Sequence, residues 1–113
     1  MTDFYKLIYF VPESHLNETK TALFSVGAGK LGNYDQCAWQ VEGRGQFRPL
    51  PGADPHLGGV GALEHVAEYR VEVLVASHSM APALQALGES HPYEEPAYEI
   101  VALVNPDLFT AGE

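Results

Sequence analysis

The sequence predicts a single α+β domain with a ferredoxin-like sandwich, in which an antiparallel sheet carries two helices on one face. One observation behind this is the order of periodic segments, which reads strand, helix, strand, strand, strand, helix, strand. The other is the length of 113 residues at 46% hydrophobic composition, which suffices for one core and not for two. We expect one domain over residues 1–113, with its core at about 4–104 and a short, loose or exchanged C-terminal tail.

The N-terminal part of the chain predicts one strand and one helix. Residues 4–11, FYKLIYFV, are rich in aromatic and β-branched types and precede a proline, which is typical of a buried strand. From Pro12 to Val26 the apolar positions fall on one helical stripe, and Gly27 is suited to end that helix.

The middle of the chain is rich in glycine and predicts two short strands and a long loop. Residues 37–42 and 45–49 read as strands joined in a hairpin at Glu42-Gly43-Arg44-Gly45. The following PLPGADPHLGGVG, residues 49–61, excludes regular structure, and a loop of this length in a small domain indicates a functional role.

The C-terminal part predicts a strand, a short helix and a final strand. Residues 64–76 alternate between a charged row, in which Arg70 lies between glutamates as a solvated ion-pair ladder, and an apolar row from Tyr69 to Val75. Pro82 to Leu87 reads as a short helix that ends at Gly88, with Ser79 as an alternative start, and residues 97–104 read as the last strand.

The charge balance excludes several classes of partner. Fifteen acidic residues against six basic ones give a formal charge of −9, so we expect neither nucleic acid nor an anionic membrane as a partner. No run of about 18 apolar residues is present, and the N-terminus lacks the layout of a signal peptide. We therefore expect a cytoplasmic protein.

Gly27, Gly29 and Gly32 have the G-x-G-x-x-G spacing of a dinucleotide-binding loop, but in the wrong context. In a nucleotide site such glycines follow a strand and open a helix, whose N-terminus binds the phosphates. Here they follow a predicted helix, and the partial negative charge of its C-terminus disfavours phosphate. We therefore interpret them as a helix stop and a tight turn that requires positive φ.

Three segments in series carry a family resemblance: VGAGKLGNYDQCAW, EGRGQFRPLPGADPHLGGVGALEHVAEYRVEV and HPYEEPAYEI. Together they resemble the small insert domain of the Nif-three-like (YqfO-type) proteins, which also occurs as a free-standing short protein, and the match covers about 100 of the 113 residues. The dinuclear metal site of the full-length family lies in flanking domains outside this match. The hydrolase-like activity proposed for those proteins is therefore not carried over.

The resemblance also implies a fold similar to CutA and the PII signalling proteins, which close into a homotrimer by pairing sheet edges. PII proteins bind nucleotides in clefts between subunits, and CutA proteins are associated with divalent copper. The resemblance thus implies a ligand cleft near the long loops without naming the ligand. In such a trimer we expect the apolar row from Tyr69 to Val75 to be covered by another subunit.

The HPYEEP segment, residues 91–96, is the most distinctive candidate site. Its two prolines favour extended backbone, so we expect Glu94 and Glu95 to point apart and only one of them to share a pocket with a given partner. One interpretation makes His91 and one glutamate ligands of a divalent cation or an acid/base pair. The other makes His91 a polar residue held by the end of the second helix, with Tyr93 packing at the rim.

The resemblance implies a trimer with ligand clefts between subunits, and together with the long loops it favours a binding or regulatory module rather than an enzyme. The predicted cleft residues come from the glycine loop, the second predicted hairpin strand and the connector: Gly27, Gly29, Gly32, Tyr34, Phe47, His91, Tyr93, Glu94 and Glu95. The alternative is a divalent-metal-binding protein or the accessory domain of a metal-assisted hydrolase, with His91 and Glu95 as ligands, which the five histidines and the acidic surplus motivate. A third hypothesis is an interaction module that docks onto a separate enzyme partner.

Overall fold

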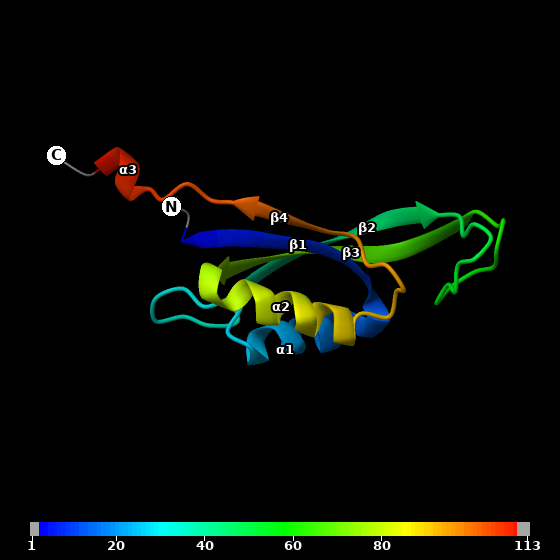
Figure 1. Cartoon of the computed structure of the whole chain (residues 1–113), viewed down its shortest axis with the longest axis horizontal. Coiled ribbons are helices and arrows are strands. Elements are labelled where there is room, and N and C mark those ends of the chain that lie inside the picture. Colours follow the sequence, from blue (N-terminus) through cyan, green and yellow to red (C-terminus); the bar gives the residue numbers. More distant parts are fainter. Residues whose placement is uncertain (1–2, 111–113) are drawn as a thin grey trace.

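The computed structural model describes residues 3–110 and confirms the α+β class. The helices α1 (Leu16–Ser25) and α2 (Ser77–Ser90) lie on one face of a four-stranded sheet, and a short 3-10 turn, η1 (Glu13–His15), precedes α1 (Figure 1). No helix within residues 3–110 is long and apolar enough to cross a membrane.

The sheet is antiparallel throughout, with the strand order β2-β3-β1-β4. Its strands are β1 (Phe4–Pro12), β2 (Ala38–Phe47), β3 (Glu64–Ala76) and β4 (Tyr98–Ala102). The central pair runs in register from Phe4 opposite Ala76 to Pro12 opposite Glu68. Within the described residues, β2 and β4 therefore form the two edges of the sheet.

The core lies between the sheet and the two helices. Alternate residues of the central strands point to this side, and the helices cover them with Leu23, Ala83 and Leu87; the buried strand residues are Leu7, Tyr9, Val11, Val71, Val73 and Val75. The expectation that another subunit covers the row from Tyr69 to Val75 is therefore wrong for its buried valines, because α1 and α2 of the same chain already cover them.

The predicted hairpin at residues 42–45 is wrong, because residues 38–47 form one continuous strand. All ten positions of β2 pair with β3, from Ala38 opposite Val73 to Phe47 opposite Glu64. Gly43 and Gly45 do not have positive φ and form no turn. The thirteen-residue β3 offers a long partner edge, and pairing along it outweighs the weak strand propensity of two glycines.

The second helix begins two residues before the alternative predicted start at Ser79 and continues past the predicted end at Gly88. Pro82 and Gly88 lie inside α2, which begins at Ser77 and ends at Ser90. Packing of its buried side chains Ser79, Ala83 and Leu87 outweighs the helix-breaking tendency of these two residues.

The described part of the C-terminal segment leaves the sheet and contains a short helix. α3 (Asp107–Thr110) extends beyond the end of the sheet (Figure 1). Residues 111–113 lie outside the described part of the chain.

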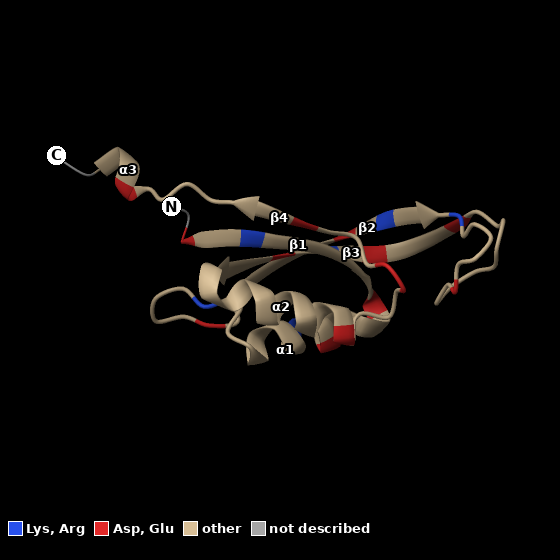
Figure 2. Cartoon of the chain, in the orientation of Figure 1, with Lys and Arg blue, Asp and Glu red and all other residues tan. Residues whose placement is uncertain are grey.

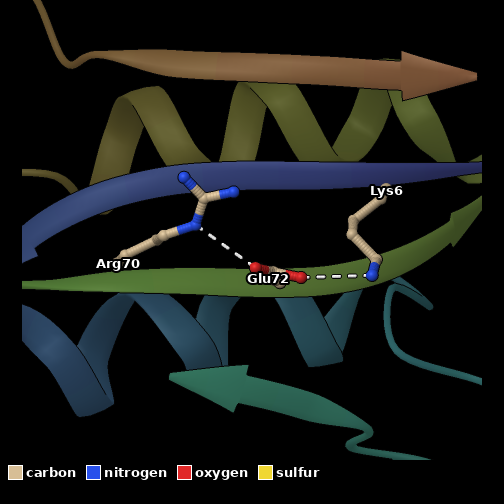
Figure 3. Close-up of polar contacts among 3 residues, drawn as sticks. All are labelled: Lys6, Arg70 and Glu72. Atoms are coloured by element: carbon tan, nitrogen blue, oxygen red, sulfur yellow. Dashed lines mark hydrogen bonds and ion pairs between the residues drawn. The ribbon is translucent and has the colours of Figure 1, made fainter. Parts of the chain in front are cut away.

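The helices leave the other face of the sheet open, and charged residues occur along its strands (Figure 2). Glu72 of β3 accepts from Lys6 Nζ at 3.1 Å and from Arg70 Nε at 3.2 Å (Figure 3), which confirms the expected ladder between Arg70 and Glu72 but not between Arg70 and Glu68. Trp39 and Val41 lie on the same face beside this ladder, with 57% and 43% of their surfaces exposed. The open face thus combines ion pairs with uncovered apolar side chains.

Candidate ligand-binding site

Three segments that are distant in sequence meet at one end of the molecule. They are the connector after α2 (residues 91–97), the loop between β2 and β3 (residues 48–63), and η1; Figure 1 shows the connector and the loop at the same end. The backbone N–H of Asp54 donates to Glu94 Oε1 at 3.1 Å, and the rings of His15 and His56 meet edge to face at 5.8 Å. These contacts hold the long loop against the connector and against η1.

His91 holds the start of the connector to the sheet. It is buried, its Nε2 lies 2.6 Å from the carbonyl oxygen of Phe10, and the backbone N–H of Tyr93 donates to its Nδ1 at 3.1 Å. Because Nδ1 accepts a proton donor, Nε2 carries the ring proton and donates to Phe10. Burial lowers the pKa of His91, which favours this neutral form.

The arrangement at His91 favours the structural interpretation, with the difference that the ring bonds to Phe10 and Tyr93 and only the backbone N–H bonds to the helix end, at Leu87. Both ring nitrogens have protein partners, so a metal ion could bind His91 only by displacing one of them. Within residues 3–110, no group of three or more histidine, cysteine, aspartate or glutamate side chains is placed to hold a metal ion.

Tyr93 is the centre of an aromatic cluster next to His91. Its ring lies 4.9 Å from the ring of His91, 6.2 Å from that of Phe47 and 6.3 Å from that of His56. Its hydroxyl donates to Glu68 Oε2 at 3.4 Å. Burial and the neighbouring Glu68 raise the pKa of Tyr93 to about 12, so the hydroxyl remains a donor at neutral pH.

The cluster borders a cavity of about 300 Å³ between β2, β3 and the connector. Most of its lining is apolar, and charged side chains enter from three segments; the lining residues are Phe10, Gln46, Phe47, Arg48, Pro49, Ala53, Pro55, His56, Leu57, Val66, Glu68, Tyr93, Glu94, Glu95 and Ala97. A cavity with apolar walls and a few converging polar groups is the usual form of a small-molecule site.

Glu94 and Glu95 both line this cavity, so the expectation that only one of them would share a pocket is wrong. The expectation rested on side chains alternating along extended backbone. Residues 93–95 bend instead, and alternation does not apply to bent backbone.

The glycine loop lies at the end of the molecule opposite the connector. Gly27, Gly29 and Gly32 all have positive φ, of 97°, 81° and 57°, which confirms their turn-forming role. A Cβ at Gly27 would lie 3.2 Å from Ser79 in the first turn of α2, whereas the connector follows the last turn, about 20 Å away along the helix. Figure 1 shows the two segments at opposite ends.

The predicted cleft residues therefore fall into two groups within one chain. Phe47, Tyr93, Glu94 and Glu95 line the cavity and His91 supports it, whereas the three glycines and the 75%-exposed Tyr34 are not among its lining residues. A cleft that includes both groups requires a second subunit. The structure also adds residues that the sequence interpretation left out of the site, chiefly Glu68, which it had placed in a solvated ladder.

Comparisons with known proteins relate the chain to one segment of longer proteins, and no protein-family model matches it. It is 48% identical over 101 residues to the GTP cyclohydrolase 1 type 2 homolog of Mycobacterium leprae, covering 89% of this chain and 26% of that protein. The corresponding protein of Mycobacterium tuberculosis is 45% identical over 106 residues, covering 94% of this chain and 28% of that protein. A Bacillus cereus protein related to NIF3 superposes with a TM-score of 0.79 at 36% identity, covering 92% of this chain and 26% of that chain.

The chain is related to the NIF3 proteins. This confirms the resemblance seen in the three sequence motifs, and the chain spans only about a quarter of the length of these relatives. CutA from Xylella fastidiosa superposes on the present chain with a TM-score of 0.66 at 18% identity, covering 96% of this chain and 93% of CutA. At this identity the likeness shows the fold, which is CutA-like.

Proposed function

We propose that this NIF3-related chain is a ligand-binding or regulatory module that assembles as a homotrimer, with the cavity at the connector end opening into a cleft between subunits. The observation that carries the proposal is a preformed cavity, built by the β2–β3 loop and the connector, on a chain whose two edge strands are uncovered. A long loop that is held in place beside such a cavity is typical of a binding site.

The apolar surface of the edge strands supports an assembly of identical chains. On β4, Tyr98, Ile100 and Val101 are 48%, 42% and 41% exposed, and on the opposite edge Trp39 is 57% exposed. Exposed edges with apolar side chains are sites at which strands of another chain pair.

The overall shape and the C-terminal segment support the same conclusion. The described chain extends over 58 × 25 × 24 Å, and α3 leaves the sheet with Leu108 and Phe109 exposed by 73% and 74%. An apolar segment that projects from its own domain is suited to pack on a neighbouring copy.

The printed name of the relatives makes guanine nucleotides the first ligands to test. The proteins of Mycobacterium leprae and Mycobacterium tuberculosis are called GTP cyclohydrolase 1 type 2 homologs. Because this chain matches about a quarter of their length, we propose binding and not the cyclohydrolase reaction for it.

Native mass spectrometry tests the assembly. We expect a complex with three times the 12.3 kDa chain mass, and we expect Val101→Lys to shift it toward monomer while Glu99→Gln on the same strand leaves it intact. A wild-type chain that is monomeric at micromolar concentration would contradict the trimer. Repeating the measurement with GTP, ATP and AMP reports retained ligand in the same spectrum.

A further inference from the structure

The carboxylate of Glu68 lies in the wall of the cavity, in a place that a glycine keeps open. Glu68 pairs with Gly43 across the β2–β3 ladder, and Gly45 follows on the same face. A Cβ built on Gly45 would collide with the Glu68 carboxylate, so the carboxylate occupies the space of the missing side chain. Gly45, which the sequence placed in a hairpin turn, therefore provides the space in which the Glu68 carboxylate lies.

Glu68 has much less compensation for its charge than Glu72, which lies four residues further along the same strand. Glu72 is paired with both Lys6 and Arg70, and these partners lower its pKa. Within residues 3–110, the hydrogen bond to the Glu68 carboxylate comes from the Tyr93 hydroxyl, and no lysine or arginine pairs with it. Burial raises the pKa of Glu68. Tyr93 uses one acceptor position of Oε2, so Oε1 and the second lone pair of Oε2 can still accept two donors from a ligand.

The lining around Glu68 is largely apolar and includes two aromatic rings. The rings of Phe47 and Tyr93 lie 6.2 Å apart with 50° between their planes, and Pro49, Pro55 and Val66 complete the lining. A volume of about 300 Å³ is at the lower end of the range for ligand pockets. The lining therefore suits a small aromatic molecule, which one of these rings can contact by its face.

The charges around the cavity favour a ligand with hydrogen-bond donors or a positive charge. Glu68, Glu94 and Glu95 line it, against Arg48 as the one lysine or arginine among the lining residues. A carboxylate binds two parallel N–H groups of a planar cation better than a single ammonium group, because both oxygens are used.

We propose that the cavity binds a small planar molecule that presents two adjacent N–H groups to the carboxylate of Glu68, with its ring against Phe47 and Tyr93. This chemistry is found in amidines and guanidines, and at the edge of a guanine base. The inference rests on the proposed ligand-binding function and adds the class of ligand and the residue that selects it.

Titration of the full chain with benzamidine, followed by NMR, tests this inference. We expect saturable binding that weakens by about tenfold or more in Glu68→Gln, because one charge-assisted pair is lost. Gly45→Ala is expected to weaken it as well, since the new methyl group displaces the carboxylate while the charge remains. The matched control Glu99→Gln, an exposed residue outside the cavity, is expected to bind within about twofold of wild type.

Benzylamine and benzoate separate planar donor recognition from general affinity for aromatic compounds. We expect benzylamine to bind more weakly than benzamidine and benzoate not to bind. Benzamidine affinity that is unchanged in Glu68→Gln, benzoate affinity equal to that of benzamidine, or no binding of benzamidine at all would each overturn the inference.

Guanosine and inosine then distinguish the two sources of this chemistry. Inosine lacks the exocyclic amino group, so guanosine binding tighter than inosine identifies a guanine base, whereas benzamidine binding without guanosine binding identifies an amidine or guanidine compound. The result also separates this inference from the proposed assembly. A trimer that does not bind benzamidine overturns the inference alone, and a monomer that binds it overturns the trimer alone.

Discussion

His91→Ala should destabilise the domain strongly, because His91 satisfies two backbone groups at once. The variant removes the partners of the Phe10 carbonyl and the Tyr93 N–H, which lie 2.6 Å and 3.1 Å from the ring nitrogens. An unsatisfied buried polar group costs about 1–3 kcal/mol, and water that enters the vacated space recovers part of this cost. We expect the free energy of unfolding to fall by about 2–4 kcal/mol.

Urea unfolding at pH 8 and fixed protein concentration measures this loss. The matched control is His78→Ala, at an exposed position of α2, for which we expect a change within about 0.5 kcal/mol. A His91→Ala variant as stable as this control would refute the role assigned to the ring. A metal-ligand role would be supported instead if the two proteins were equally stable without metal and added metal stabilised wild type but not His91→Ala.

The same residue predicts a pH dependence with a defined sign. The pKa of His91 lies below its ordinary value of 6.5 in the folded chain, because burial disfavours the charged ring. The unfolded chain therefore binds the proton more readily, and stability present above pH 6.5 is lost as the pH falls through the folded pKa. We expect wild type to lose stability below pH 6.5 more steeply than His91→Ala, and equal slopes would contradict this.

Three further predictions concern the glycine loop, the core and the cavity. Gly29→Ala should cost more stability than Gly32→Ala in thermal unfolding: both have positive φ, but a Cβ at Gly29 meets Cys37 and Phe24 at 3.0 Å and one at Gly32 meets nothing within 4 Å. Equal losses would show that backbone strain alone matters. Thr19→Val should cost about 1–3 kcal/mol and more than Tyr9→Phe, because it leaves the buried Tyr9 hydroxyl without its acceptor at 2.9 Å. Urea unfolding of both variants checks this, and the reverse order would contradict it. Glu68→Gln should be at least as stable as wild type at pH 7, because the raised pKa of Glu68 means that stability present below pH 4.5 is lost as the pH rises through the folded pKa. A clear loss of stability in this variant at pH 7 would be inconsistent with an uncompensated carboxylate.

The elements with a strong sequence period were predictable. Residues 4–11 and 64–76 correspond closely to β1 and β3, since aromatic and β-branched composition and strict alternation report burial directly. The turn role of Gly27 was also predictable, because a glycine after a helical stripe is the common way for a helix to end.

The elements that depend on distant partners were not predictable in the same way. Gly43 and Gly45 resemble turn residues in sequence, but their strand conformation is set by β3. Pro82 resembles a helix start, yet packing against the core continues α2 on both sides of it. Local patterns do not contain this tertiary information.

The candidate site was half predictable for the same reason. The HPYEEP segment is distinctive in sequence, and Tyr93, Glu94 and Glu95 line the cavity. Glu68 lies 25 residues before Tyr93, and its alternation with Arg70 indicated an ordinary solvated strand. Only the fold shows that the Tyr93 hydroxyl donates to the Glu68 carboxylate, and that Gly45 leaves room for this carboxylate because it has no side chain.

A crystal structure of the chain with benzamidine tests the central claim most directly, because it locates the ligand. The account predicts the amidinium nitrogens within about 3 Å of the Glu68 carboxylate, with the ring against Phe47 and Tyr93. Benzamidine ordered instead at the turn formed by Gly27, Gly29 and Gly32, with the cavity beside Glu68 left empty, would contradict it.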